Sequence, residues 1–321
     1  MTTTSTRRTW DPHALPDQTD RTVVVTGANA GIGYFVAEQL AGAGAHVVVA
    51  ARDAGKAERA RAAIDARHPG ATTSFLELDL ASLASVRAAG ERLAGLDRVD
   101  ALVLNAAAMR ISTPGEATAD GFDPIMGTGH LGNAALIAHA LPVLARTAGS
   151  RVVGTTSGLV RRFHPDVEDL ARSSRPLGSA RALPVGRRYV QSKAAHEAFV
   201  LELDRRLRAA GSPVSALLSH PGVAVGSRTP VRDGVVDHPR GERRHEPLWG
   251  LVGASKETAA WSAVRAAADP DARGGQYWGP SGRVTGPPVL GRPHPRSGDP
   301  ALGARVWRET EALLGLRVPV G

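Results

Sequence analysis

The chain has 321 residues, of which 42% are hydrophobic, and its 39 lysines and arginines outnumber 31 aspartates and glutamates to give a formal net charge of +8. It contains no cysteine, which excludes a disulfide framework, a thiolate nucleophile and a cysteine-bound metal. The histidines show no HExxH or similar ligand spacing, so no metal site is expected. The arginines lie beside acidic residues, as in 58–67 and 201–210, which predicts a solvated mixed-charge surface and no nucleic-acid partner; an anionic ligand is the alternative.

Membrane spans and export signals both require a continuous apolar segment. No apolar run approaches the roughly 18 residues of a membrane span. The first ten residues, MTTTSTRRTW, lack the apolar centre of a signal peptide. We therefore expect a cytoplasmic protein with no membrane partner.

From about residue 20 the sequence alternates between apolar β-branched runs and helical patterns. Strands are predicted at 22–27, 46–52, 72–80, 99–107, 151–157, 213–222 and 275–280. Helices are predicted at 31–44, 53–68, 189–210 and 301–315, with one after the third strand and a long one that ends near Arg146. Strands that are apolar throughout require cover on both faces, so we predict an α/β fold, a Rossmann-type doubly wound parallel sheet of about seven strands.

One domain is expected over residues 1–321, with an N-terminal arm at 1–19 and a Pro/Gly-rich tail followed by a helix at 286–321. Two stretches rich in Arg, Pro, Gly and His, 158–188 and 223–250, interrupt the alternation. They follow the fifth and sixth strands, at the sheet edge where such folds bind ligands. They are either surface loops or a substrate lid.

The turn after the first strand reads TGANAGIG, with Gly27, Gly31 and Gly33 in the spacing G-x-x-x-G-x-G. Glycines there let the backbone turn tightly and approach a pyrophosphate at the next helix N-terminus. Asn29 and Ile32 belong to the same turn and are candidate cofactor contacts. The alternative is an ordinary glycine-rich turn between a strand and a helix.

The second predicted strand ends in Ala50-Ala51-Arg52, followed by Asp53. A site for NAD would place a carboxylate at this strand end, whereas a guanidinium suits the 2′-phosphate of NADP. We therefore predict that Arg52 selects NADP(H). In the alternative interpretation Arg52 is one more surface arginine and Asp53 is a helix cap.

Tyr189 and Lys193 are one of three tyrosines and one of three lysines in the chain, and they lie four residues apart in RRYVQSK. The spacing places both side chains on one face of a helix. A nearby ammonium stabilises a phenolate and lowers the pKa of the phenol, which lets it exchange a proton with a substrate oxygen. A surface Tyr/Lys pair is the alternative.

Together with these motifs, the sequence resembles the short-chain dehydrogenase/reductase family over about residues 16–318. The matching segments are TGANAGIG, ELDL, LNAA, TTSG, YVQSK and HPG, in that order. The opening PDQTDRTVVVTG, the long gap between Ser157 and Tyr189, and YWGP near the carboxyl end are most similar to the retinol-dehydrogenase-like branch. In that branch we expect hydride exchange between NADPH and a small-molecule carbonyl or alcohol.

The resemblance implies roles for individual residues. Tyr189 would be the general acid/base, Lys193 would lower its pKa and hold the nicotinamide ribose, and Ser157 would polarise the substrate oxygen. Further cofactor contacts are implied for Asp79, Leu80, Asn105, Ala106, Pro221 and Gly222. The family also commonly pairs through long helices beside the active site, which implies a homodimer or homotetramer.

The sequence departs from the family pattern in the predicted helix after the fourth strand. Gly129 lies in GTGHLGN where the family usually places an asparagine that holds a water for the lysine. His130 and Asn133 are nearby, but helical geometry points them to other faces. The Thr that often follows the Pro-Gly turn is also absent, with Gly226 in its place.

Three functions are compatible with this pattern. The leading one is an NADP-dependent oxidoreductase that interconverts a carbonyl and an alcohol, with Tyr189 as acid/base. Gly129 favours a second, a protein that binds NADP(H) as a sensor without turnover. The third is a non-redox enzyme that reuses the fold.

Overall fold

A computed structural model describes residues 10–108, 115–163, 167, 169–176, 185–235, 253–282 and 284–320. Eight strands form one sheet in the order β3-β2-β1-β4-β5-β6-β7-β8. They are β1 Thr22–Thr26, β2 His46–Ala51, β3 Thr73–Glu77, β4 Ala101–Leu104, β5 Arg151–Thr155, β6 Ser215–Ser219, β7 Tyr277–Pro280 and β8 Pro288–Leu290. Neighbouring strands are parallel except for β8, which pairs antiparallel with β7. The strand order reverses direction between β1 and β4, the position where doubly wound folds bind ligands.

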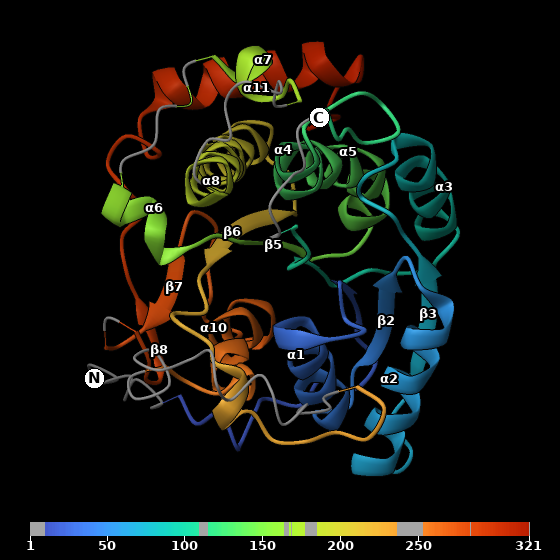
Figure 1. The fold of residues 1–321 in the computed structure, drawn as a ribbon. Coiled ribbons are helices and arrows are strands. Elements are labelled where there is room, and N and C mark those ends of the chain that lie inside the picture. The colour runs from blue at the N-terminus through green and yellow to red at the C-terminus, as the bar shows by residue number, and fades with distance from the viewer. Residues whose placement is uncertain are drawn as a thin grey trace, which may run out of the picture.

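Helices cover both faces of this sheet (Figure 1). The longer ones are α1 Gly31–Gly42, α2 Ala54–Arg67, α3 Leu83–Ala94, α5 Gly132–Ala145, α8 Val185–Ala209, α10 Lys256–Ala268 and α11 Pro300–Leu314. Short turns are α4 Pro124–Met126, the π-helical η1 Gly127–Leu131, α6 Gly158–Phe163, α7 Leu170–Ser173 and the 3₁₀ turn η2 Gly226–Arg228. In Figure 1 α3, α5 and α8 lie on one side of the sheet and α1, α2 and α10 on the other.

The apolar strands divide their side chains between the two helical layers. Val24, Leu102 and Val152 are buried in the cluster that includes α3, α5 and α8. Val23 and Val25 belong to the cluster on the opposite face, with α1, α2 and α10. This alternation is the reason that the strands are apolar at every position. In the described part of the chain no helix is both long and apolar enough to cross a membrane.

The predicted architecture is confirmed, with three differences. The helix that carries Tyr189 begins four residues earlier, at Val185. Helix α10 was not predicted, because most of its buried residues are alanines and its apolar stripe is weak. The tail predicted from 286 contains β8, a three-residue strand whose pairing with β7 the sequence pattern of so short a run does not reveal.

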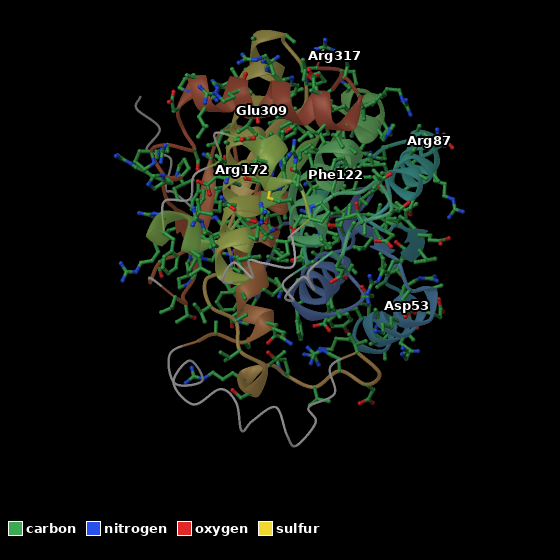
Figure 2. The ribbon with its side chains drawn as sticks, turned by 45° about the horizontal axis from the view of Figure 1, so that its top comes forward. Asp53, Arg87, Phe122, Arg172, Glu309 and Arg317 are labelled. Carbon is green, nitrogen blue, oxygen red and sulfur yellow. The ribbon has the colours of Figure 1, made fainter. Side chains whose placement is uncertain are left out.

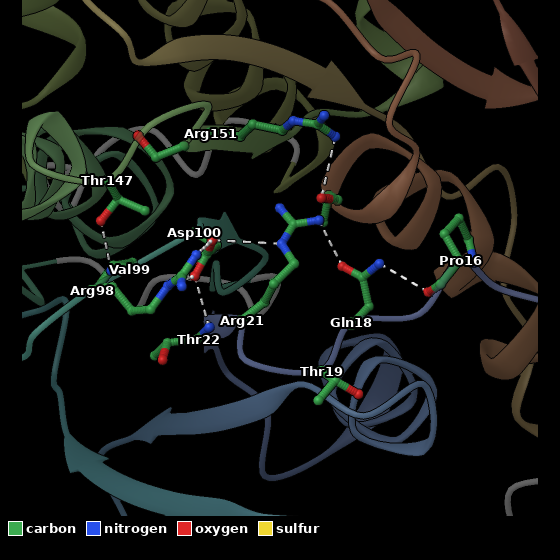
Figure 3. Close-up of polar contacts among 12 residues, drawn as sticks. Pro16, Gln18, Thr19, Arg21, Thr22, Arg98, Val99, Asp100, Thr147 and Arg151 are labelled. Atoms are coloured by element: carbon green, nitrogen blue, oxygen red, sulfur yellow. Dashed lines mark hydrogen bonds and ion pairs between the residues drawn. The ribbon is translucent and has the colours of Figure 1, made fainter.

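The amino-terminal ends of the strands are joined by a polar cluster (Figure 3). The buried Asp100 carboxylate accepts a hydrogen bond from Thr22 N at 2.9 Å and two from the Arg98 guanidinium. Arg151 at the start of β5 donates to Asp269 O at 2.7 Å, beyond the end of α10, where helix carbonyls lack partners within the helix. Burial lowers the pKa of Arg151 to about 10. These contacts fix the sheet at the edge opposite the glycine turn.

Helix α11 covers the outside of α8. Trp307 stacks on Phe199 with ring centroids 4.8 Å apart, and the Arg206 guanidinium lies 4.5 Å from the Trp307 ring. Glu309 accepts a hydrogen bond from Leu170 N at 2.7 Å, which ties α11 to α7. Figure 2 shows Glu309 along α11, with Arg172 of α7 beneath it and Asp53 at the far side of the molecule. The C-terminal helix therefore shields the helix that carries Tyr189 and Lys193.

Candidate active site

The glycine turn lies between β1 and α1 and requires glycine at two positions for different reasons. Gly27 has a φ of +67°, and a Cβ there would lie 3.0 Å from Ala106 Cβ. A Cβ on Gly33 would lie 2.5 Å from Gly27 O and from Asn105 Nδ2. Gly31, with a φ of +60°, has open space around it. The turn therefore packs on the end of β4 while its outer side stays open.

The first turn of α1 is suited to an anion. Its cap residue, Ala30, makes no side-chain hydrogen bond to the helix. Amides of an uncapped first turn point outward with the positive end of the helix dipole, which is the usual binding site of a phosphate group. Asn29 and Ile32 are half-buried beside it. The predicted cofactor turn thus has the backbone that a pyrophosphate needs.

The end of β4 supports this turn from below. Thr26 Oγ1 accepts hydrogen bonds from Asn105 N and Ala106 N, both at 3.0 Å. Asn105 Nδ2 donates to Thr26 O at 3.2 Å, and Asn133 Nδ2 donates to Ala106 O at 3.3 Å. The Asn105 carboxamide therefore holds the glycine turn in place.

An open pocket lies where β2 and β3 end, lined by Arg52, Asp53, Glu77, Asp79, Ser82 and Ser85. Asp53 caps α2 by accepting from Lys56 N at 2.9 Å. Asp79 Oδ1 accepts from Ala81 N at 2.9 Å, and Leu80 beside it is buried. The structure thus brings the predicted Arg52, Asp79 and Leu80 to one edge, with three carboxylates around the single guanidinium.

Ser157, Tyr189 and Lys193 meet at the end of β5. Burial raises the pKa of Tyr189, and the neighbouring Ser157 side chain opposes the rise. Lys193 is 2% exposed, and its Nζ donates to Thr155 O at 2.7 Å. Burial lowers the pKa of Lys193 to about 8. Burial of the phenol dominates in this arrangement, and the lowering of the pKa of Tyr189 by Lys193 stays a prediction.

The region around Gly129 differs from the regular helix that the sequence predicts. Gly129 lies in the π-helical turn η1, and a Cβ there would lie 2.7 Å from Ser192 Oγ. His130 Nε2 is paired with Thr310 Oγ1 at 2.8 Å, and Asn133 Nδ2 donates to Thr128 O at 2.8 Å. As expected, these two side chains point away from the position of the missing side chain. Ser192 occupies that space.

The turn after β6 also requires glycine. Gly222 has a φ of +74°, and a Cβ there would lie 2.2 Å from Val284 O. His220 Nδ1 accepts from Gly222 N at 3.3 Å, and burial lowers the pKa of His220 to about 4. Pro221 and Gly222 therefore lie between the end of β6 and the loop after β7.

Comparison with known proteins agrees with this geometry. The family model described as short chain dehydrogenase matches residues 21–165. Retinol dehydrogenase 13 of Homo sapiens is 34% identical over 93% of this chain and 86% of that protein. Polyprenol dehydrogenase of Mus musculus is 36% identical over 95% of this chain and 87% of its own length. This chain belongs to the short-chain dehydrogenase/reductase family.

A solved structure extends the similarity to the whole fold. The crystal structure of a protein from Mycobacterium paratuberculosis matches with a TM-score of 0.74 and 32% identity over 97% of this chain and 99% of that one. The relatives place this short-chain dehydrogenase/reductase in the retinol-dehydrogenase-like branch. It is an oxidoreductase of a family that binds NAD(P) and acts on CH–OH or C=O groups of small molecules.

The predicted lid segments of this dehydrogenase are described in part. Within 158–188, residues 164–166, 168 and 177–184 lie outside the described residues, as do 236–250 of the second segment. The described parts contain α6, α7 and η2. Whether they close over a substrate stays a prediction.

Sequence reasoning missed three buried polar residues, Glu38, Glu197 and His196, and the half-buried Arg232 that pairs with Glu38. Arg232 pairs with Glu38 of α1, at 2.6 Å and 2.8 Å. Glu197 accepts from Thr156 Oγ1 at 2.8 Å, next to Ser157, and burial raises the pKa of Glu197. His196 is fully buried one turn after Lys193. A charged or polar residue on the apolar stripe of a predicted helix is the signal that could have found Glu38, Glu197 and His196.

In the part of the chain that is described, no three potential metal ligands gather.

Proposed function

We propose that this dehydrogenase uses NADP(H) to interconvert a carbonyl and an alcohol, with Tyr189 as the general acid/base. The observation that carries the proposal is that Ser157 acts directly on the Tyr189 phenol, with buried Lys193 one turn further along α8. A phenol and a hydroxyl that lie side by side can both reach one substrate oxygen.

The residues of this chain would divide the chemistry as follows. The bound nicotinamide supplies or accepts the hydride. In the reducing direction Ser157 donates a hydrogen bond to the carbonyl oxygen and the Tyr189 phenol transfers its proton to that oxygen. The Lys193 ammonium, on the same helix face, stabilises the phenolate that remains. Because Lys193 is buried and Tyr189 is half-buried, this stabilisation acts through a lowered dielectric.

NADP(H) fits the cofactor edge of the site. The open side of the Gly31 turn and the uncapped start of α1 suit the pyrophosphate. Arg52 is the cation among the side chains that line the pocket between β2 and β3, and a guanidinium binds a 2′-phosphate through two parallel hydrogen bonds. Asp53 is engaged as the N-cap of α2. We therefore expect Arg52 to be the residue that contacts this phosphate.

An apolar alcohol or aldehyde is the substrate class that we propose. Helix α6 begins directly after Ser157 and exposes Leu159 and Phe163, which are 41% and 63% exposed. Residues four apart lie on one face of a helix, so the two side chains form an apolar edge beside Ser157. Two relatives are named for retinol and polyprenol, which are long apolar alcohols.

The test is turnover by the purified protein. NADPH or NADH is mixed with a panel of short and long-chain aldehydes, ketones and quinones, and the cofactor absorbance is followed. We expect oxidation of NADPH with apolar aldehydes and its loss in Tyr189→Phe. Tight NADPH binding without turnover on any member of the panel would instead favour the sensor function.

A further inference from the structure

His196 lies one turn after Lys193 on α8 and is fully buried. Neither of its ring nitrogens has a hydrogen-bond partner among the described residues. A neutral imidazole carries one donor and one acceptor, and leaving both unpaired in the interior is unfavourable. Such an arrangement is stable when an internal water supplies the missing bonds.

A second buried histidine faces the first from η1. The His130 and His196 ring centroids are 6.4 Å apart, at an interplanar angle of 70°. Thr310 Oγ1 donates to Val306 O at 2.6 Å, so its oxygen accepts from His130 Nε2. This fixes His130 as the Nε2–H tautomer and leaves Nδ1 as an acceptor, again with no partner in the described part of the chain.

Strand β5 brings His196 and Lys193 to adjacent peptide units. A Cβ on Gly154 would lie 3.0 Å from His196 Nε2, so this ring edge touches the strand at a position without a side chain. The Lys193 ammonium binds the carbonyl of the next residue, Thr155. An ammonium carries three N–H donors, and Thr155 O takes one of them.

We propose that His196 and His130 form an internal water-binding site beside Lys193, and that the water stabilises the charged form of this lysine. The inference rests on the proposed function of the Tyr189/Lys193 pair and deepens it. His196 is then a positioning residue that acts through Lys193. It supplies from α8 a polar contact that a glycine at position 129 cannot supply from η1.

Besides burial, Lys193 and His130 are the neighbours that affect the pKa of His196. Burial lowers the pKa of His196 well below its ordinary value, and the nearby Lys193 and His130 lower it further. Burial lowers the pKa of His130 to about 3, so both rings are neutral at working pH. Other charged groups on and around α8 interact elsewhere. They include Glu197 with Thr156, Arg161 near Glu197 and His220, Asp123 near Arg188, Glu309 with Leu170 N, and Glu311 with Arg317.

The small number of lysines makes a direct test possible. With ¹³Cε-labelled lysine, the chain gives resonances for Lys56, Lys193 and Lys256 alone, and Lys56→Arg and Lys256→Arg assign the third. The titration midpoint of Lys193 is measured in the protein without cofactor, in His196→Leu, and in the polar variant His196→Asn. We expect His196→Leu to lower the midpoint by about one pH unit or more and His196→Asn to change it by less than half of that.

Phe199→Leu is the matched control, because Phe199 lies one turn further on α8 and its ring is 5.6 Å from His130. It alters packing without removing a polar group and should leave the midpoint unchanged. A midpoint in His196→Leu equal to that of the unaltered protein, or an equal shift in Phe199→Leu, overturns the proposal. If His196→Leu does not fold, magnetisation transfer from slowly exchanging water to the His196 ring protons of the unaltered protein decides the question. Absence of that transfer also overturns it.

Turnover provides a second readout that separates this inference from the proposed function. If the protein reduces a carbonyl, His196→Leu should lower kcat about tenfold at pH 8 and move the alkaline decline of kcat to lower pH, with unchanged Kd for NADPH. If no carbonyl is reduced, the proposed function fails, whereas the lysine titration still tests the water site.

Discussion

The carboxylate of Glu38 on α1 accepts hydrogen bonds from Nε and Nη2 of Arg232, 194 residues later in the chain. Glu38 also accepts the Tyr34 hydroxyl at 2.7 Å, and the Arg232 guanidinium lies 5.4 Å from the Phe35 ring. The Glu38 side chain is 4% exposed and that of Arg232 is 14% exposed. The segment after β6 is thus anchored to the helix whose first turn we propose as the pyrophosphate site.

Arg232→Gln should destabilise the protein, because it leaves the Glu38 carboxylate buried without its cation. We expect a loss of about 3 kcal/mol in the free energy of unfolding, measured by urea denaturation. The double variant Glu38→Gln/Arg232→Gln should recover a part of this loss. Arg317→Gln is the control: its ion pair with Glu311 involves an arginine that is 91% exposed, so the change should be below about 0.5 kcal/mol. Equal losses in the two single arginine variants would contradict the anchor.

The glycine turn gives a prediction on cofactor binding. Gly33→Ala places a methyl group 2.5 Å from Gly27 O and Asn105 Nδ2, so the turn must open. We expect NADPH affinity to fall at least tenfold, measured as Kd by quenching of protein fluorescence. Gly70→Ala, also on a turn but with open space around it, should cost only backbone strain of about 1 kcal/mol and leave Kd unchanged.

Arg52 predicts the choice between the two nicotinamide cofactors. Arg52→Ala should weaken NADPH binding by about tenfold to a hundredfold and leave NADH binding unchanged, because only NADPH carries the 2′-phosphate. Lys56→Ala, in the first turn of α2, removes a nearby exposed cation and serves as the control. If NADH binds the unaltered protein as tightly as NADPH does, the proposed role of Arg52 is wrong.

Lys193 makes stability depend on pH in a definite direction. Burial lowers the pKa of Lys193 from 10.5 to about 8, so between these values the unfolded chain binds more protons than the folded one. The free energy of unfolding therefore rises with pH through this window. Relative to Lys193→Met, which shares the tyrosine ionisations, we expect a gain of about 1–2 kcal/mol between pH 8 and 9.5. If the free energy of unfolding, measured with urea, depended on pH in the same way in both proteins, the pKa of Lys193 would not be lowered.

The features of the fold and the site that the sequence predicts are those set by local residue patterns. The Val-rich strands, the Gly27 turn and the spacing of Tyr189 and Lys193 each follow from neighbouring residues, because strand and helix periodicity is local. The contact between Glu38 and Arg232 joins residues far apart in sequence, so no local pattern reveals it. The buried position of Lys193 follows the same rule, since it depends on β5 and on how η1 and α11 pack against α8.

Gly129 shows where sequence reasoning needs the packing of two helices. The sequence suggests that Gly129→Asn should restore a missing side chain and speed a reaction limited by proton supply. In the structure that side chain would begin 2.7 Å from Ser192 Oγ, whose hydroxyl is buried and bound to Tyr189 O at 2.8 Å. The substitution must therefore displace the serine next to Lys193.

We accordingly expect Gly129→Asn alone to lower the free energy of unfolding by about 1–3 kcal/mol, as overpacked interiors do, and to leave kcat unchanged or reduced. Gly129→Asn/Ser192→Ala removes the clashing hydroxyl and should recover most of that stability, because the new side chain then has room beside α8. Gly186→Asn, at an exposed glycine of α8 with open space around it, controls for the effect of placing asparagine in a helix. Urea unfolding and kcat measured on all three variants test the prediction. A single variant as stable as the unaltered protein would show that Ser192 moves aside at no cost.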